Sequence, residues 1–247
     1  MASFSRPPGG QPIRGLLFDK DGTLFDFRLT WGRWCAGFIR DLAKGDESAA
    51  EALSGKLGYD LVREEFAPTS PVIAGTMDVV VQAIKSCFPE LSRAAIRAHV
   101  LASTSEVPQV EAVPLSALMA RLKGDGHTLG IATNDAEQAA RHHLDSSGIL
   151  EEFSFIAGYD SGFGAKPDPG MLLAFCDHSN FEPADCVMIG DSTHDLLSGR
   201  AAGMRTVGVL TGLAEAEELA DLADVILPSI GALPGWIDGE NRTVAAL

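Results

Sequence analysis

The sequence is short of positive charge. Lysine and arginine together number 19 against 34 aspartates and glutamates, which gives a formal net charge of -15 at pH 7. Binding to a nucleic-acid backbone requires a basic stripe, and no cluster of Lys and Arg occurs along the chain. We therefore expect no nucleic-acid partner. An anionic substrate would have to be held by local groups, because net charge informs solubility rather than substrate choice.

Long apolar runs are also lacking. No stretch approaches about 18 consecutive apolar residues, so no membrane-spanning helix and no membrane partner are expected. Residues 1–11 contain one arginine, two prolines and no apolar run, which argues against a secretory signal. The four cysteines show no C-x-x-C spacing and lie among apolar neighbours, which is typical of buried thiols rather than of disulfides or zinc sites. We expect a cytoplasmic protein.

Short apolar runs are present, and they predict a parallel sheet. The six expected strands are Ile13–Phe18, Thr128–Ala132, Phe155–Ala157, Val187–Ile189, Thr206–Leu210 and Val225–Leu227. Helical segments alternate with these runs, namely Asp135–Ser147, Pro169–His178 and His194–Ala202. Glycine follows two of the segments and proline begins the other, which are common helix boundaries. This alternation predicts an α/β fold with a doubly wound, Rossmann-like parallel sheet.

The interval between the first two expected strands is too long for a single crossover helix. Helical patterns fill it at Trp31–Leu42, Glu47–Gly58, Asp60–Phe66, Met77–Cys87 and Arg93–Ala102, without strand alternation. Val113-Pro114 marks the return of the chain, and Leu115–Lys123 predicts the helix before the second strand. We therefore predict a catalytic core of residues 1–26 and 111–247, with a small helical domain of residues 27–110 inserted into it.

Acidic side chains follow two of the expected strands. Asp19-Lys20-Asp21-Gly22-Thr23 ends the first apolar run, and Asp191 and Asp195 follow the fourth. Open α/β sheets bind ligands at these strand ends. Two carboxylates two residues apart can divide nucleophilic and acid/base work. A calcium loop that starts at Asp19 is excluded, because its twelfth position holds Thr30 and not glutamate.

Polar groups follow the second expected strand and lie in a later loop. Thr133 and Asn134 could hold phosphate oxygens through a hydroxyl and amide N–H groups at the start of the next helix. Helix capping, by Asn134 or Asp135, explains the same residues equally well. Lys166 lies between Gly164 and Pro167, where it could neutralise an anion. Taken alone, a lysine in such a loop is most simply a surface residue.

Taken in chain order, four segments resemble the haloacid dehalogenase superfamily, in the subgroup similar to phosphoglycolate phosphatase. They are Asp19-Lys20-Asp21-Gly22-Thr23, Ile131-Ala132-Thr133-Asn134, Gly164-Ala165-Lys166-Pro167-Asp168-Pro169 and Val187-Met188-Ile189-Gly190-Asp191-Ser192-Thr193-His194-Asp195. The resemblance covers the chain from about Ile13 to Trp236. It implies that the inserted helical domain is a cap, and that the cap selects the substrate.

The resemblance also implies a role for each site residue. Asp19 is expected to be the nucleophile that forms an aspartyl-phosphate, and Asp21 the general acid and base. Lys166 is expected to neutralise negative charge, and Thr133 to bind phosphate. The implied ligands of Mg²⁺ are Asp19, Asp191 and the backbone carbonyl of Asp21. Asp195 would hold a metal-bound water or position Lys166, although a helix cap is the simpler reading of Asp195 alone.

These roles indicate a Mg²⁺-dependent phosphatase for a small phosphorylated metabolite, with 2-phosphoglycolate favoured by the resemblance. A sugar phosphomutase similar to β-phosphoglucomutase would share the acids and the cap. A phospho-acceptor or binding module without turnover is a further alternative. The sequence does not indicate an oligomeric state. His142 and His143 lie in a polar helix without metal-ligand spacing, and we expect both to be solvated.

Overall fold

The computed structural model describes residues 12–67, 70–74, 77–105 and 107–245. The expectation that the N-terminus carries no secretory signal concerns residues 1–11, which lie outside these ranges. The chain forms two compact units, one made of Met1–Phe27 with Gln109–Leu247 and the other of Arg28–Pro108.

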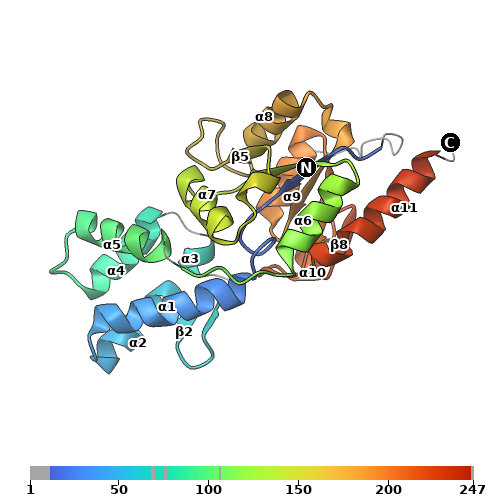
Figure 1. Cartoon of the computed structure of the whole chain (residues 1–247). Helices are drawn as coiled ribbons and strands as arrows, with labels where there is room; N and C mark the ends of the chain where they lie inside the picture. Colours follow the sequence, from blue (N-terminus) through green and yellow to red (C-terminus); the bar gives the residue numbers. More distant parts are fainter. Residues whose placement is uncertain (1–11, 68–69, 75–76, 106, 246–247) are drawn as a thin grey trace. The chain divides into compact units, whose positions relative to one another are not determined.

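A six-stranded sheet forms the centre of the first unit (Figure 1). Its strands are β1 (Gly15–Phe18), β4 (Thr128–Ala132), β5 (Phe155–Ala157), β6 (Cys186–Gly190), β7 (Arg205–Val209) and β8 (Val225–Leu227). All pairings are parallel, and the order across the sheet is β5-β4-β1-β6-β7-β8. The predicted doubly wound α/β fold is confirmed.

Helices cover both faces of this sheet. They are α6 (Leu115–Gly124), α7 (Glu137–Ser146), α8 (Gly170–Ser179), α9 (Thr193–Ala202), α10 (Ala216–Leu219) and α11 (Leu233–Ala245), with short 3-10 turns η1 (Leu150–Glu152), η2 (Pro183–Asp185) and η3 (Ile230–Ala232). Leu16 and Phe18 of β1 are buried in one apolar cluster with residues of α6, α7 and α11. Leu17 is buried in a second cluster with residues of α8 and α9. This alternation along one strand gives the sheet two apolar faces.

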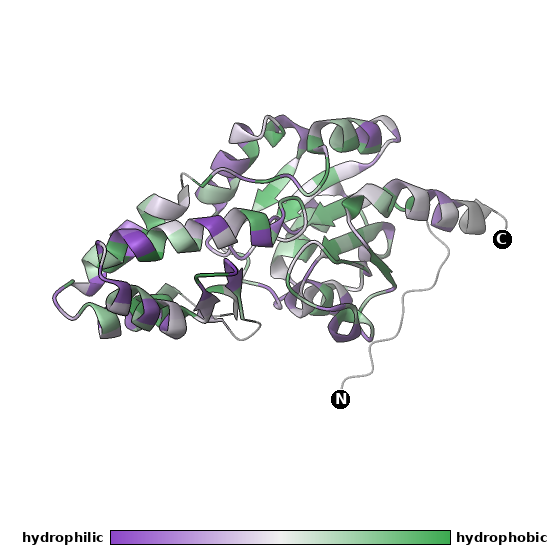
Figure 2. Ribbon diagram, turned by 90° about the horizontal axis from the view of Figure 1, so that it is seen from below, coloured by the Kyte–Doolittle hydropathy of each residue, from purple (hydrophilic) through white to green (hydrophobic). Residues whose placement is uncertain are grey.

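The position of β1 determines where a ligand can bind. The chain passes from β1 outward to β4 and β5, then returns to β6 beside β1 and continues outward to β7 and β8. The connections that leave β1 and β6 therefore run in opposite directions, and the point between two such strands is where open α/β sheets bind ligands. The strands of this sheet are largely hydrophobic (Figure 2), as expected for a sheet that is buried on both faces.

The second unit is mostly helical. Its elements are α1 (Phe27–Ala43), which begins at the unit boundary, α2 (Glu47–Leu57), β2 (Tyr59–Asp60), β3 (Glu65–Phe66), α3 (Pro71–Ala74), α4 (Met77–Cys87) and α5 (Arg93–Ser105). The strands β2 and β3 pair in an antiparallel hairpin. Residues 27–110 are thus helical except for this hairpin and its connecting loops, within the part of the chain that the structure describes.

The prediction of a helix at Asp60–Phe66 is wrong, because local side-chain bonds favour a turn. Oδ1 of Asp60 accepts hydrogen bonds from the backbone N–H groups of Val62, at 2.8 Å, and Arg63, at 2.9 Å. An aspartate that binds the backbone in this way closes a turn. Glu64 then adopts a left-handed conformation with φ of 56°, which interrupts any helix.

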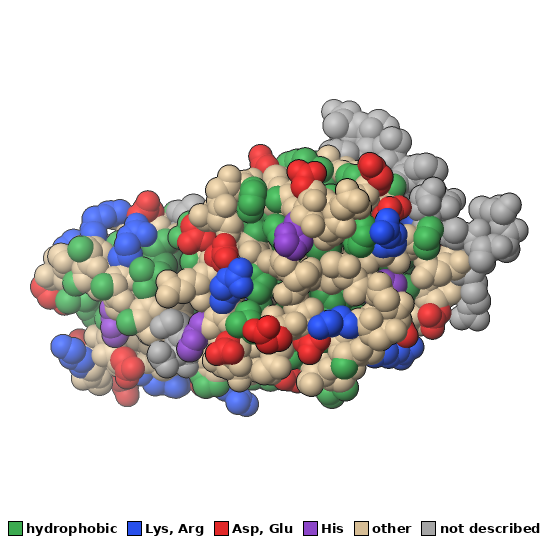
Figure 3. Space-filling model, turned by 45° about the horizontal axis from the view of Figure 1, so that its top comes forward, with side chains coloured by type: hydrophobic (Ala, Val, Ile, Leu, Met, Phe, Trp, Pro, Cys, Tyr) green, Lys and Arg blue, Asp and Glu red, His purple; other side chains and the backbone are tan. Residues whose placement is uncertain are grey.

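Charged side chains of both signs lie on the surface drawn in Figure 3. On the face drawn in Figure 3, lysine and arginine side chains are interspersed with aspartate and glutamate, and no continuous basic stripe is visible there. Among the described residues, no helix combines the length and the apolar character needed to cross a membrane.

Candidate active site

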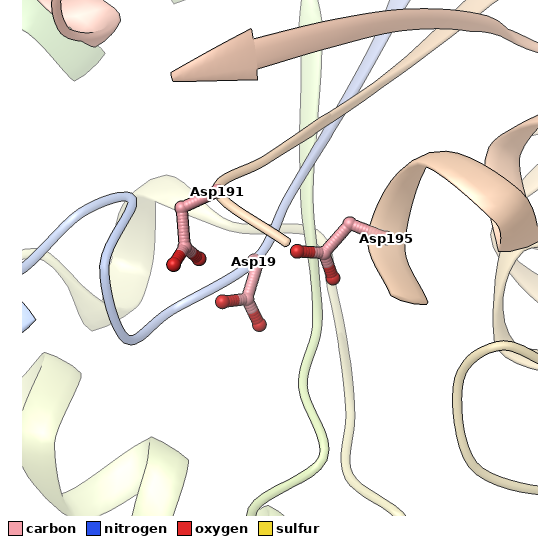
Figure 4. A group of neighbouring side chains, drawn as sticks. All are labelled: Asp19, Asp191 and Asp195. Atoms are coloured by element: carbon pink, nitrogen blue, oxygen red, sulfur yellow. The ribbon is translucent and has the colours of Figure 1, made fainter. Parts of the chain in front are cut away.

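Three buried aspartates converge beyond the carboxyl ends of β1 and β6. The backbone N–H of Asp19 donates to the carbonyl of Ile189 at 2.8 Å, which extends the β1–β6 pairing to the residue that carries the carboxylate. Asp191 follows β6 directly, and Asp195 lies in the first turn of α9. One carboxylate oxygen from each aspartate lies within 4.8 Å of the others (Figure 4). The exposed fractions of Asp19, Asp191 and Asp195 are 8%, 7% and 1%.

Lys166 brings a buried positive charge to this group. Its Nζ donates to Oδ1 of Asp19 at 2.7 Å, contacts Oδ1 of Asp195 at 2.6 Å and donates to the carbonyl of Ala132 at 2.7 Å. These three acceptors match the three N–H groups of an ammonium. The sequence-based alternative of a surface lysine is therefore not what the structure shows, since Lys166 is 5% exposed.

Asn134 fixes the backbone of Lys166. Its side-chain nitrogen donates to the carbonyl of Lys166 at 2.9 Å, and its side-chain oxygen accepts from the N–H of Lys166 at 2.9 Å. Capping by Asn134 is not observed, because α7 begins at Glu137 after Ala136. The side chain of Asn134 thus holds the lysine loop.

Thr133 is buried at the end of β4. Its hydroxyl oxygen accepts from the N–H of Asp135 at 3.1 Å, which closes the turn between the strand and α7. The N–H of Thr133 donates to the carbonyl of Ala157 at 3.0 Å and continues the β4–β5 pairing. Thr133 therefore follows Ala132, whose carbonyl accepts a hydrogen bond from the ammonium of Lys166.

The carboxylate of Asp195 contacts both Lys166 and the start of α9. Its Oδ1 contacts Lys166, while its Oδ2 accepts from the hydroxyl of Ser192 at 2.7 Å and from the N–H of Ser192 at 3.0 Å. With the bond from the N–H of Asp195 to the Ser192 hydroxyl, these contacts form a capping box at the start of α9. The helix start therefore fixes the carboxylate that faces Lys166.

Burial strongly affects the charges of this cluster. Burial raises the pKa of Asp19 to about 7; Lys166 opposes this rise, and Asp195 and Asp21 reinforce it. Burial likewise raises the pKa of Asp191 well above its usual value, with Asp19 adding to the effect. Although burial lowers the pKa of Lys166, Asp19 and Asp195 more than compensate, so that its pKa lies above the usual value. Three buried carboxylates share one lysine, and an all-oxygen group with surplus negative charge fits a hard divalent cation such as Mg²⁺.

The loop after β7 packs against Asp191. A Cβ atom on Gly212 would lie 1.7 Å from Oδ2 of Asp191, so glycine is needed there for close approach. Gly22 is restricted in the same way, because its φ of +82° is left-handed and a Cβ would lie 2.4 Å from the same oxygen. The hydroxyl of Thr211 donates to the carbonyl of Gly22 at 2.6 Å and joins the two loops. Asp191 is thus confined by backbone on two sides.

We expect Gly212→Ala to lower catalytic turnover by about 10²-fold, because displacement of a site group by about 1 Å has effects of this size. Steady-state phosphate release from purified protein measures the change. Gly235→Ala is the matched control, since a Cβ at Gly235 meets no atom within 4 Å. Equal activity of the two variants would show that Asp191 tolerates displacement.

We expect Asp191→Asn to stabilise the metal-free protein by on the order of 1–2 kcal/mol near pH 8, because it removes one of several mutually repelling buried charges. The pKa of Asp19 is raised from 3.8 to about 7 in the folded protein. The unfolded chain therefore loses its proton first, and the stability of the metal-free wild type falls as pH rises through this interval. Asp191→Asn should flatten that fall.

Denaturant unfolding in chelator from pH 5 to 8 measures this effect. When the measurements are repeated with Mg²⁺, the added Mg²⁺ should stabilise the wild type more than the variant. Asp177→Asn, on the exposed surface of α8, is the control. A variant that is less stable than the wild type at pH 8 in chelator would contradict the expectation.

Sequence reasoning missed Lys20 and misjudged one histidine. Lys20 is fully buried, and its Nζ lies 2.6 Å from Oδ2 of Asp21, 3.4 Å from Oδ2 of Asp135 and 3.2 Å from Nδ1 of His143. The expectation that His143 is solvated is wrong, since it is 2% exposed, whereas His142 is exposed as expected. The sequence signal for Lys20 was its position between Asp19 and Asp21 at the end of a buried strand.

The family model for haloacid dehalogenase-like hydrolases matches residues 13–203 of this chain. The chain belongs to the haloacid dehalogenase-like hydrolases. This membership confirms the family predicted from the four segments. The site residues themselves are not tested by the match.

Individual relatives of this hydrolase are phosphatases. It is 31% identical to the phosphoglycolate phosphatase of Rhodospirillum rubrum over 231 residues, which cover 91% of this chain and 90% of the relative. It is 36% identical to the probable phosphatase IndB of Dickeya dadantii over 101 residues, and this match spans only 44% of that protein and 41% of this chain. The hydrolase is therefore similar to the phosphatases of its family.

Solved structures show the same fold at low identity. The β-phosphoglucomutase of Clostridium difficile has a TM-score of 0.57 at 18% identity, and the match covers 95% of this chain and all of that chain (100%). A likeness at this identity concerns the fold alone. A shared fold does not distinguish hydrolysis from phosphate transfer, because function depends on the chemistry of the site.

Proposed function

We propose that this hydrolase is a Mg²⁺-dependent phosphatase that acts on a small phosphorylated metabolite through an aspartyl-phosphate at Asp19. The observation that carries the proposal is the buried group of Asp19, Asp191, Asp195 and Lys166 between the ends of β1 and β6. A carboxylate held by a lysine at a ligand-binding strand end is suited to nucleophilic attack on an anionic phosphoryl group.

The proposed reaction has two displacements. An oxygen of Asp19 forms a bond to phosphorus while the bond from phosphorus to the ester oxygen breaks, and the leaving oxygen takes a proton from Asp21. Asp21 then accepts a proton from water as the water oxygen bonds to phosphorus, and the bond to Asp19 breaks. The products are the alcohol and inorganic phosphate, with both aspartates restored. Lys166 remains protonated and stabilises negative charge near Asp19 throughout.

The cation site proposed here comprises the carboxylates of Asp19 and Asp191 and the backbone carbonyl of Asp21, with Asp195 in support. The surplus of buried carboxylates over lysine is consistent with a divalent cation at this place. Mg²⁺, when bound, supplies positive charge that orients the nucleophile and neutralises the phosphoryl oxygens. The hydroxyl of Thr133 and the backbone N–H of Asn134 are proposed to bind the phosphate oxygens, as the family resemblance implies for Thr133.

The favoured substrate is 2-phosphoglycolate. The support is the similarity to the phosphoglycolate phosphatase of Rhodospirillum rubrum along most of both chains. We propose that residues 27–110 form the cap that selects the ester, as the family resemblance implies. The core, residues 1–26 and 111–247, would then carry the chemistry.

The deciding experiment is steady-state phosphate release, with Mg²⁺ and with chelator, on 2-phosphoglycolate, sugar phosphates, nucleotides and an aryl phosphate. The proposal predicts Mg²⁺-dependent release, fastest with 2-phosphoglycolate. Retained sugar bisphosphate without phosphate release would favour a phosphomutase, and a lasting aspartyl-phosphate without turnover would favour a phospho-acceptor. Either result would overturn the phosphatase proposal.

A further inference from the structure

A second buried lysine lies beside Asp21. The side chain of Lys20 is 0% exposed, and its Nζ contacts Oδ2 of Asp21 at 2.6 Å and Oδ2 of Asp135 at 3.4 Å. The same nitrogen lies 3.2 Å from Nδ1 of His143 on α7. The side chains of Asp21 and Asp135 are partly exposed, at 21% and 31%. The ammonium is therefore enclosed by protein, while the carboxylates it binds reach the surface of the site.

The surroundings of Lys20 keep it charged. Burial lowers the pKa of Lys20, but Asp21 and Asp135 outweigh burial and leave the pKa above its usual value. An ammonium has no lone pair, so Nδ1 of His143 must accept the hydrogen bond from Nζ. A buried charge with two carboxylates and an imidazole around it has one favoured position.

The backbone around Asp21 is also ordered by Lys20. The carbonyl of Lys20 accepts from the N–H groups of Leu24, at 3.0 Å, and Phe25, at 3.2 Å, and the N–H of Gly22 donates to the carbonyl of Phe25 at 2.7 Å. This tight turn fixes the Cα of Asp21 but leaves its side-chain torsions to other contacts. The 2.6 Å contact with Lys20 supplies a charged bond to the carboxylate itself.

We propose that Lys20 is a positioning residue that holds the carboxylate of Asp21 in place for proton transfer; this inference rests on the proposed function. Asp135 and His143 belong to the segment that follows β4, the strand that ends at Thr133. One ammonium thus connects the acid/base loop after β1 to the segment proposed to bind phosphate. Geometry that is fixed to this extent matters because a general acid must lie within hydrogen-bond reach of the leaving oxygen.

The test uses the dependence of Lys20→Met on the leaving group. An alkyl ester needs a proton on its leaving oxygen, whereas 4-nitrophenolate leaves readily without one. We expect Lys20→Met to lower kcat/KM for the best alkyl ester of the panel by about 10²-fold, within the range for general acid catalysis. For 4-nitrophenyl phosphate the loss in kcat/KM should stay below about tenfold, because kcat/KM ends at the first irreversible step and omits the later hydrolysis.

A second signature is expected from rapid mixing. With 4-nitrophenyl phosphate, Lys20→Met should release a burst of one nitrophenolate per enzyme and then turn over slowly, because Asp21 is also the base for the second step. Lys123→Met is the matched control, since Lys123 is an exposed lysine of α6 that pairs with Glu152. It should leave both esters unaffected.

Equal losses on both esters, or no loss on either, would overturn the positioning role. If Lys20→Met does not fold, His143→Leu replaces it, because this variant removes the acceptor on α7 and keeps Lys20 itself; it should show the same preference at smaller size, and equal losses would again contradict the proposal. Failure of the wild type to release phosphate from any ester would instead overturn the proposed function.

Discussion

Asp19→Asn should lower phosphate release by about 10⁴-fold or more, because the amide cannot serve as the attacking nucleophile and no second carboxylate occupies its place. The substitution nearly preserves shape, and Lys166 retains its bonds to Ala132 and Asp195. The fold should therefore survive. Steady-state phosphate release, together with trapping of the phosphoenzyme by acid quench, measures the effect.

The control for Asp19→Asn is Asp177→Asn, which makes the same chemical change on the exposed surface of α8. This control should keep full turnover and form the phosphoenzyme. Substantial turnover by correctly folded Asp19→Asn would remove Asp19 from the role of nucleophile. Asp191→Asn provides a useful contrast, because it is expected to change the response to Mg²⁺ and not the atom that attacks phosphorus.

Lys166→Met should destabilise the metal-free protein by about 3–5 kcal/mol at pH 8, which is the range for removing one partner of a buried ion pair. The variant leaves Asp19 and Asp195 without their shared cation. The destabilisation should be smaller at pH 5.5, because Asp19, whose pKa is raised by burial to about 7, becomes neutral there. Turnover should also fall by about 10²–10³-fold, since charge stabilisation is lost.

Denaturant unfolding in chelator at both pH values measures the effect of Lys166→Met on stability. Lys56→Met, at an exposed position of α2, should change the free energy of unfolding by less than about 0.5 kcal/mol. A destabilisation of equal size at pH 5.5 and pH 8 would show that packing, and not charge, explains the role of Lys166.

The sheet could be predicted from the sequence because its strands are short apolar runs that end at glycine or a polar residue. The runs at Thr128–Ala132, Phe155–Ala157 and Val225–Leu227 have the predicted bounds, and the other three strands differ from prediction by one or two residues at an end. The proximity of Asp19 and Asp191 follows from the neighbouring parallel strands β1 and β6, which end at one edge, whereas Lys166 reaches the group from the loop between β5 and α8.

One error concerns hydrogen bonds between neighbouring residues, and the other a contact between residues that lie far apart in the sequence. The Asp60–Phe66 segment has apolar spacing compatible with a helix. The side chain of Asp60, however, accepts hydrogen bonds from the backbone N–H groups two and three residues later, and a hairpin forms instead. The helix around His143 is polar, which predicts a solvated side chain. Only the fold brings Lys20, which lies 123 positions away in the sequence, into contact with it. The contact between Lys20 and His143 beside Asp21 thus depends on the fold and not on the local sequence.

The central place of β1 has a consequence for the order of folding during synthesis. Gly15–Phe18 pairs on one side with residues 128–131 and on the other with residues 186–189. During synthesis β1 therefore waits for its first partner until residue 131 and for its second until residue 189 has been added, whereas the contacts within Arg28–Pro108 are available earlier. Until then at least one edge of this apolar strand lacks its partner, and unpaired strand edges of this kind favour aggregation.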